Sequence, residues 1–293
     1  MPEGSVGPEG SIGPATTERS LALVLGGGGI AGIAWHTGVL CGLADAGVDL
    51  SGADRLVGTS AGATVAVQVG AGRPLADLFD RQVDPASLAT ELTSGLSVTE
   101  LWERIAPIYT ESTDEDDRRR HLGRLALDAD TVDEAVRRRV IAARLEGLDW
   151  AEDRVSVVAV EAATGERCIF GGSSGVDVVD AVTASCAVPG VWPPATIGGT
   201  RYVDGGIWSL TNSDLAIGCD RVVVLAPIPD PAMHAELSGL GAGVVSVVIT
   251  PDTPSLEAFG SDVLDPASRE PSARAGRAQG RMEAARLAPL LVG

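Results

Sequence analysis

The chain has 293 residues, 45% of them hydrophobic, which is enough for one large α/β domain or two small ones with a substantial core. Its formal net charge is −18, which argues against nucleic acid as a partner and against electrostatic docking on anionic lipid, because both depend on cationic contacts. All 22 basic residues are arginine, and the lack of lysine excludes a Walker A phosphate loop.

The first 20 residues differ from the rest of the chain. Residues 2–13 contain a tandem hexapeptide, PEGSVG and then PEGSIG, which is too poor in bulky side chains to pack. We therefore expect residues 1–20 to form a disordered low-complexity tail. This stretch lacks the features of a secretion signal, and no run of about twenty apolar residues is present to span a bilayer. The expected location is cytoplasmic, with transient apolar contact as the remaining route to a membrane.

From Leu21 onward the pattern alternates between strand and helix. Residues 21–25 are apolar and predict a strand, and a glycine loop then precedes a helix expected over about 32–46. A second strand is expected around 55–57, followed by a helix from Ala61. Strands that alternate with helices favour a parallel sheet.

Residues 73–150 have a different pattern, which indicates a helical insertion. SVTELWERIAPIY shows apolar residues at helical spacing, and TVDEAVRRRVIAARLEGL opens with a predicted capping box of Thr131 and Glu134. The charged run DEDDRRR at 114–120 is interpreted as a solvated face or loop.

Strand patterns resume after the insertion, which indicates that the same domain continues. They are VSVVAV at 155–160, CIF at 168–170, RYV at 201–203, RVVVLAP at 221–227 and VVSVVI at 244–249. An arginine-rich pattern predicts a C-terminal helix over 272–293. We therefore expect residues 21–293 to form one α/β domain, a three-layer sandwich with a central, mostly parallel sheet flanked by helices.

The cysteines and histidines do not suggest a metal site. Cys41, Cys168, Cys186 and Cys219 are widely separated, and the histidines do not cluster. We expect the cysteines to be small core residues, and we expect neither a metal nor a cofactor.

The segment RLVGTSAGATVAV carries G-x-S-x-G at residues 58–62, between a short apolar strand and a helix. This is the context of a nucleophile elbow, a sharp turn that exposes a serine hydroxyl at a helix N-terminus. Gly58 and Gly62 meet the need for small flanking residues, so Ser60 is the predicted nucleophile. The alternative interpretation is a tight turn without chemistry.

The first glycine loop also fits a nucleotide-binding pattern, because Gly27, Gly29 and Gly32 satisfy G-x-G-x-x-G. A dinucleotide fold needs an acidic residue about twenty positions later, at the end of the second strand, where this chain has GTS. Two successive glycine-rich turns suggest instead that one presents a nucleophile and the other presents N–H donors for an oxyanion. A non-enzymatic nucleotide-binding module remains the alternative.

A serine nucleophile needs a base, and Asp204 in RYVDGGIW follows a strand pattern that would place its carboxylate at a strand end. Of the three histidines, His36 lies in the first predicted helix and His121 follows the charged run. His234 lies beyond Asp204, so the serine–aspartate–histidine order of α/β-hydrolases stays open.

Four segments between residue 21 and about 227 resemble, in order, those of the patatin-like phospholipase family. LGGGGIAG is similar to its glycine-rich oxyanion segment, GTSAGA to its nucleophile elbow, ASCAVPGVWPP to its Ala-Ser…Pro segment, and DGGIWSLTNSDLA to its Asp-Gly-Gly block followed by an asparagine. That family works with a serine–aspartate dyad and no catalytic histidine. The helical insertion and the residues after 227 lie outside these motifs.

The resemblance implies that Ser60 is the nucleophile and that Asp204 is the base. The oxyanion hole that it implies consists of backbone amides at Gly27, Gly28, Gly29 and Ala61. The supporting residues that it implies are Gly58, Gly62, Gly205, Gly206 and Asn212. Most members of the family have arginine or lysine before the last glycine of the first segment, whereas this chain has Ala31 there, so a cation that would recognise an anionic substrate group is missing.

The resemblance also implies hydrolysis of lipid carboxylic esters through an acyl-enzyme, as in phospholipases A, lysophospholipases and acyl esterases. The alternative is an esterase or thioesterase for small soluble substrates, favoured by the acidic composition. The insertion residues that would line an acyl slot, or else pack in the core, are Trp102, Ile105, Ile108 and Tyr109. Trp192 is expected to support Asp204 or the sheet. Nothing in the sequence indicates the oligomeric state.

Overall fold

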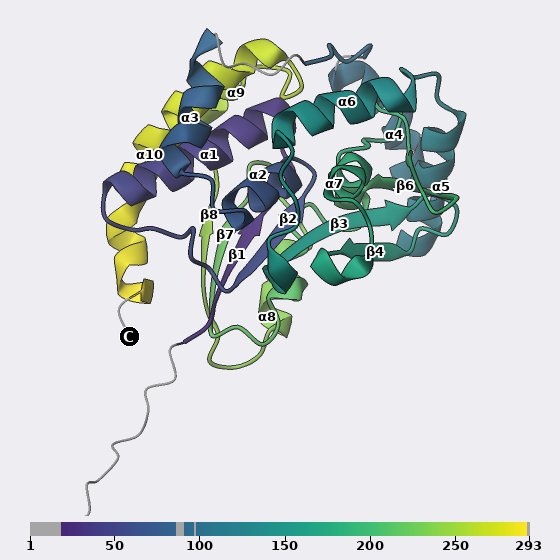
Figure 1. Cartoon of the computed structure of the whole chain (residues 1–293). Helices are drawn as coiled ribbons and strands as arrows, with labels where there is room; N and C mark the ends of the chain where they lie inside the picture. Colours follow the sequence, from purple (N-terminus) through teal and green to yellow (C-terminus); the bar gives the residue numbers. More distant parts are fainter. Residues whose placement is uncertain (1–18, 86–90, 97, 292–293) are drawn as a thin grey trace, which may run out of the picture.

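The structure, a computed structural model, describes residues 19–85, 91–96 and 98–291, so the predicted tail up to residue 18 lies outside the described residues. At the centre is an eight-stranded sheet in the order β5-β6-β3-β2-β1-β7-β8, with β4 paired to β3 outside this path (Figure 1). The strands are β1 Leu21–Leu25, β2 Arg55–Thr59, β3 Val155–Glu161, β4 Arg167–Phe170, β5 Ala195–Ile197, β6 Thr200–Asp204, β7 Arg221–Leu225 and β8 Val245–Ile249.

The middle of the sheet is parallel. β1 pairs in parallel with β2 and β7, β2 with β3, and β7 with β8. β4, β5 and β6 join through antiparallel pairs. The mostly parallel sheet predicted from the alternation of strands and helices is therefore confirmed.

Helices cover both faces of this sheet (Figure 1). They are α1 Gly29–Asp45, α2 Ala61–Gly70, α3 Leu75–Val83, α4 Val98–Glu111, α5 Glu115–Asp128, α6 Glu134–Leu145, α7 Val178–Ser185, α8 Met233–Gly239, α9 Thr253–Phe259 and α10 Arg269–Leu291. The described residues between 73 and 150 contain α3 to α6 and no strand. The predicted sandwich of helices around a central sheet is confirmed.

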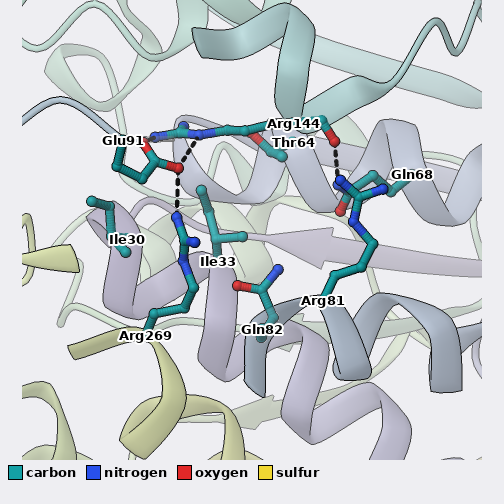
Figure 2. Close-up of a pocket in the computed structure, with 9 residues that line it drawn as sticks. All are labelled: Ile30, Ile33, Thr64, Gln68, Arg81, Gln82, Glu91, Arg144 and Arg269. Atoms are coloured by element: carbon teal, nitrogen blue, oxygen red, sulfur yellow. Dashed lines mark hydrogen bonds and ion pairs between the residues drawn. The ribbon is translucent and has the colours of Figure 1, made fainter. Parts of the chain in front are cut away.

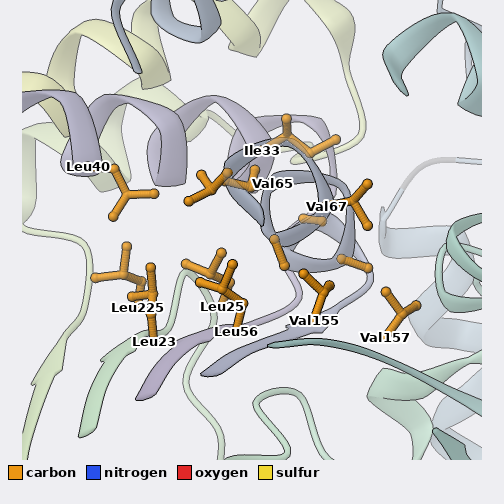
Figure 3. Packing of buried hydrophobic residues seen from close by; sticks show 14 of the residues in the cluster. Leu23, Leu25, Ile33, Leu40, Leu56, Val65, Val67, Val155, Val157 and Leu225 are labelled. Carbon is orange, nitrogen blue, oxygen red and sulfur yellow. The ribbon is translucent and has the colours of Figure 1, made fainter. Parts of the chain in front are cut away.

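The core lies on both sides of the sheet because both faces of the central strands are buried. Along β1, Leu23 and Leu25 pack with side chains of α1 and α2 (Figure 3), whereas Ala22 and Val24 face a second cluster that includes Met233 of α8. A fully buried parallel strand reads as a continuous apolar run, which is the pattern of residues 21–25. Cys41, Cys186 and Cys219 are buried as expected, and Cys168 is half-buried.

Two predicted helix starts are wrong. α1 begins at Gly29 rather than at 32, because the carbonyl of Gly28 already accepts a hydrogen bond from the amide of Gly32 at 2.8 Å. The predicted capping box of Thr131 and Glu134 is replaced by Asp133, whose side chain caps the first amides of α6. A single aspartate at the N-cap position satisfies those amides directly.

The charged run at 114–120 caps and begins α5, and all of it except Arg119 is exposed or half-buried, so the interpretation as a solvated face is confirmed and the interpretation as a loop is wrong. Asp114 is the N-cap of α5, and its side chain accepts a hydrogen bond from the amide of Asp117 at 2.8 Å. Arg119 in this run is buried, with its guanidinium 4.0 Å from the centroid of the Trp208 ring. The predicted C-terminal helix likewise begins earlier, at Arg269 rather than at 272.

The topology brings the ends of β2 and β6 together on one edge of β3. β2 runs parallel to β3 and ends with Thr59 opposite Val158, whereas β6 runs antiparallel to β3 and ends with Asp204 opposite Ala159. Because β4 occupies the other edge of β3 at these positions, β2 and β6 share one edge and point at each other. The residues that follow Thr59 therefore start beside Asp204.

Helices α1 and α10 approach each other closely through glycines. A Cβ atom at Gly38 or Gly42 of α1 would overlap the backbone of α10, and a Cβ atom at Gly276 or Gly280 would overlap the backbone of α1. The two helices lie side by side in Figure 1, and α1 begins at the glycine loop. This contact therefore holds the helix that carries the loop.

We expect Gly42→Ala to destabilise the protein, because its methyl group would meet the carbonyl oxygen of Arg277 and force the two helices apart. Overpacking of this kind costs about 1–3 kcal/mol. Thermal or denaturant unfolding measures the loss. The matched control is Gly52→Ala, where a Cβ atom meets nothing within 4 Å, and equal unfolding midpoints for the two variants would contradict this account of the packing.

Candidate active site

Ser60 lies in a sharp turn between β2 and α2. Its backbone has φ 54° and ψ −116°, a conformation that is costly for a residue with a side chain. A Cβ atom at Gly62 would overlap the carbonyl oxygen of Leu25, and one at Gly58 would lie 2.5 Å from the Cα atom of Ala63. The turn therefore forms only with glycine at both positions, as the G-x-S-x-G pattern requires.

Two neighbouring side chains hold this strained turn in place. The amide of Ser60 donates a hydrogen bond to Ser185 Oγ at 2.9 Å, and its carbonyl accepts one from Cys186 Sγ at 3.2 Å. Both partners lie at the end of α7, in the segment that resembles the Ala-Ser…Pro motif. Ser185 leaves no signal of its own in the sequence, and only the resemblance of this segment to the Ala-Ser…Pro motif indicates that it matters.

Asp204 lies at the end of β6 and is 4% exposed. Its Oδ1 accepts a hydrogen bond from the amide of Gly206 at 2.8 Å, whereas its buried Oδ2 has no hydrogen-bond partner among the described residues. Burial raises the pKa of Asp204 to about 6. The Ser60 side chain, the Gly206 amide and the charge of Arg137 act in the opposite direction. The carboxylate therefore has a proton affinity above that of an ordinary aspartate and an oxygen free to accept a proton.

Ser60 and Asp204 line one pocket of about 260 Å³. The Ser60 side chain is close enough to Asp204 to stabilise the charged form of the carboxylate. The hydroxyl and the carboxylate therefore lie next to each other in the pocket wall. No histidine is among the described residues that line this pocket. His234 is exposed on α8, and His121 faces Asp117 on α5, so neither lies beside Ser60.

The glycine loop forms another part of the pocket wall. Its backbone amides differ in whether they already donate a hydrogen bond within the protein. The amide of Gly27 donates to the carbonyl of Leu210 at 2.8 Å, so it is already engaged. The amides of Gly28, Gly29 and Ala61 have no acceptor among the described residues. Gly28 and Gly29 lie at the start of α1 and Ala61 at the start of α2, so these three amides are among the donors left at the two helix N-termini.

His36 fixes the position of this loop. It is fully buried on α1, and its Nε2 lies 2.9 Å from the carbonyl oxygen of Gly26. Burial lowers the pKa of His36 to about 4, so the ring is neutral and Nε2–H donates to that oxygen. The amide of Gly62 donates to the same oxygen at 3.2 Å, which joins the loop to the nucleophile turn. His36 thus bonds to the loop rather than to its own helix.

Asn212 connects the elbow with the segment after Asp204. Its Nδ2 donates to Thr59 Oγ1 at 3.0 Å and to the carbonyl of Ser209 at 2.6 Å, and its Oδ1 accepts from Arg167 at 3.2 Å. Its backbone adopts φ 51°, which asparagine tolerates better than most residues. It therefore bonds both to the residue before Ser60 and within its own turn.

The rest of the pocket is apolar, and the helical segment forms one part of its wall. Leu101, Ile105, Tyr109 and Leu122 line it, on α4 and α5. The other two candidates for an acyl slot do not: Ile108 is not part of the lining, and Trp102 is 57% exposed. The helical spacing identified α4 correctly but could not show which of its faces meets the pocket.

Metal binding and membrane crossing are two further functions on which the described residues bear. No group of three His, Cys, Asp or Glu side chains in this part of the chain is arranged to hold a metal ion. No helix within the described ranges combines the length and the apolar character needed to cross a bilayer.

Comparison with known proteins identifies the family. Among solved structures, VipD from Legionella pneumophila aligns with 14% identity and a TM-score of 0.46, over 92% of this chain and 67% of VipD. The type III effector protein ExoU aligns with 15% identity and a TM-score of 0.40, over 92% of this chain and 53% of ExoU, so this chain spans about half the length of ExoU. Curated protein sequences contain no match. The sequence profile of patatin-like phospholipases matches residues 23–217, which is more than half of the chain. The chain therefore belongs to the patatin-like phospholipase family and is a patatin-like lipid acyl hydrolase.

Proposed function

We propose that this protein hydrolyses carboxylic esters of lipids through an acyl-enzyme on Ser60, with Asp204 as the base. The observation that supports the proposal is the meeting of Ser60 and Asp204 in an apolar pocket beside the glycine loop. The phospholipase A, lysophospholipase and acyl esterase reactions all follow this chemistry and differ in the alcohol that leaves.

The reaction proceeds in two halves. Ser60 Oγ forms a bond to the ester carbonyl carbon while its proton passes to Asp204 Oδ2. The intermediate collapses, the bond to the alcohol oxygen breaks, and the proton on Asp204 passes to that oxygen. A water molecule then attacks the acyl carbonyl as Asp204 takes one of its protons. Ser60 recovers this proton as the carboxylic acid leaves.

An aspartate with a pKa of about 4 is a weak base for a serine hydroxyl. Burial raises the pKa of Asp204 to about 6, which narrows the difference in pKa between the carboxylate and the serine hydroxyl that it must deprotonate. The negative charge on the former carbonyl oxygen needs donors as well, and we assign this role to the amides of Gly28, Gly29 and Ala61. One such donor is typically worth about 10²–10³ in rate. Gly27 stays outside this set because its amide is bonded to Leu210.

The pocket favours an acyl chain as the part of the substrate that it binds. Its volume of about 260 Å³ lies below the roughly 300–1,000 Å³ that encloses a drug-sized ligand, which suits one chain better than two. Trp102 and Tyr109 on α4 are exposed, with ring centroids 5.9 Å apart, and Tyr109 also lines the pocket. We propose that this aromatic pair makes transient apolar contact with a membrane next to the pocket.

The small volume also favours a second candidate function, the hydrolysis of small soluble esters or thioesters. Such a substrate would use Ser60 and Asp204 in the same way and would leave much of the apolar lining empty.

Labelling with a fluorophosphonate tests the assignment of Ser60 and Asp204. We expect Ser60→Ala to abolish labelling, because the probe bonds to the nucleophile. Asp204→Asn keeps the size of the side chain but removes the proton acceptor, so the labelling rate should fall by about 10²–10⁴-fold. The control is His234→Ala, which changes an exposed residue on α8 and should label like the wild type. Loss of labelling in His234→Ala together with normal labelling of Asp204→Asn would show that the serine–aspartate assignment is wrong.

The pH dependence of activity tests the role of Asp204 as a base. Only its deprotonated form accepts the Ser60 proton, and its pKa is about 6. We therefore expect kcat/KM on a neutral ester to fall as the pH drops below about 6 and to level off above it. A rate that stays constant from about pH 5 to 7 would contradict this role.

A series of acyl esters of increasing chain length separates the lipid from the small-ester candidate. We expect kcat/KM to rise with chain length until the pocket is filled, because each buried CH₂ contributes about 0.8 kcal/mol. Ile105→Trp narrows the pocket and should move the optimum to shorter chains. Leu127→Trp, at a 40% exposed position of α5 outside the pocket, is the matched control. A flat series in the wild type would favour the small soluble ester.

A further inference from the structure

A buried arginine lies beside Ser60 without an acidic partner. Arg137 of α6 is 4% exposed, yet its guanidinium forms no hydrogen bond and no ion pair among the described residues. Its Nε is both buried and unpaired, and its guanidinium stacks on the ring of Trp192 at 3.9 Å from the centroid. Because an unpaired charge is costly to bury, such a side chain points to a ligand that supplies the missing negative charge.

The neighbouring arginines show the contrast. Arg144 and Arg269 also reach the interior, but both bind the buried carboxylate of Glu91 (Figure 2). Arg144 donates to Glu91 through Nε at 2.9 Å and through Nη2 at 2.5 Å, and Arg269 donates through Nη2 at 2.7 Å. The carboxylate of Glu91 is thus shared by Arg144 and Arg269 and forms no ion pair with Arg137. Glu91 and Asp204 act on Arg137 only through their charge, without an ion pair.

Arg137 faces a small recess next to the nucleophile. Ser60, Ala61, Gly29 and Trp192 line this recess together with Arg137. Its volume is about 20 Å³, which is room for one or two oxygen atoms. Ser60 and Gly29 also line the apolar pocket, so the recess adjoins it at the nucleophile. A substrate whose acyl chain lies in the pocket can therefore place an oxygen atom in the recess.

We propose that Arg137 binds an anionic phosphate oxygen of the substrate while Ser60 attacks the neighbouring acyl ester. This inference rests on the proposed function and deepens it, because it assigns the recognition of a charged group to one residue. Ala31, at the position where a cation is missing from the first glycine segment, is fully buried and uncharged. In a chain of net charge −18, a local cation is needed to offset the repulsion of an anionic group. Charge-assisted bonds from a guanidinium to phosphate oxygens provide this attraction.

The test compares two short-chain substrates with the same acyl group, a neutral monoacylglycerol and the corresponding monoacylglycerol phosphate. We expect Arg137→Met to lower kcat/KM for the phosphate by on the order of 10- to 100-fold, the range of a charged hydrogen bond, mainly through KM. The neutral ester is assayed at about pH 8, where Asp204 stays deprotonated even when loss of the Arg137 charge raises its pKa above about 6, and there kcat/KM should stay within about 3-fold of the wild type, well below that range. Arg137→Lys keeps the charge and should recover part of the loss.

Controls separate recognition from folding. Arg139→Met removes one positive charge from an exposed position of the same helix and should leave the ratio of the two substrates unchanged. Activity of Arg137→Met on the neutral ester shows that this variant folds with an intact nucleophile. Equal losses on both substrates, or an unchanged ratio, would overturn the role of Arg137. Failure of the wild type to hydrolyse either ester in a Ser60-dependent manner would instead overturn the proposed function.

Inorganic phosphate, used as an inhibitor, distinguishes two kinds of site. The first binds any phosphate, and the second binds a phosphate group only when it is part of the substrate. Competitive inhibition of neutral-ester hydrolysis in the wild type and its loss in Arg137→Met support the first. Discrimination between the two esters without inhibition supports the second. Inhibition that persists unchanged in Arg137→Met together with an unchanged substrate ratio would overturn the proposal.

Discussion

The carbonyl oxygen of Gly26 joins the two halves of the candidate site. It accepts hydrogen bonds from Nε2 of His36 and from the amide of Gly62, which belong to the helices that follow the two glycine-rich turns. The first turn carries the free amides of Gly28 and Gly29, and the second carries Ser60. Each hydrogen bond contributes only about 0.5–1.5 kcal/mol, but a buried carbonyl left without donors would cost about 1–3 kcal/mol. The shared oxygen therefore couples the position of the donors to that of the nucleophile.

The sheet brings the candidate base to the same place by a different route. β3 extends past the end of β2, and its free edge is taken by β6, which runs the other way. The carboxylate of Asp204 thereby becomes buried, which is the main cause of its raised pKa. A Cβ atom at Gly205 would overlap the backbone of Val158, so glycine directly after Asp204 allows β6 to end tight against β3. Topology, rather than any local motif, raises the proton affinity of this aspartate.

The helical segment between residues 73 and 150 provides both pocket-lining and charged residues to the candidate site. Its α4 and α5 form part of the apolar wall, and its α6 carries Arg137 and Arg144. The overall charge of −18 describes the chain as a whole, whereas the interior near Ser60 holds a cluster of arginines with few carboxylates. A strongly acidic protein can thus contain a positively charged recess. The local electrostatic potential depends on the nearest buried charges rather than on the net charge of the whole chain.

The sequence by itself determined the fold class and the nucleophile turn, because each leaves a local pattern, and its resemblance to the family made Asp204 the candidate base. Apolar runs alternating with helical spacing predicted the parallel sheet, and the crowded turn around Ser60 accepts only glycine at Gly58 and Gly62. Only the tertiary structure decided which amides stay free, since the acceptor that occupies Gly27 comes from Leu210, far along the chain. It also decided that Arg137 lies beside Ser60, unpaired and buried. Charge and burial at these positions arise from contacts between distant segments, and such contacts leave no periodic signal in the sequence.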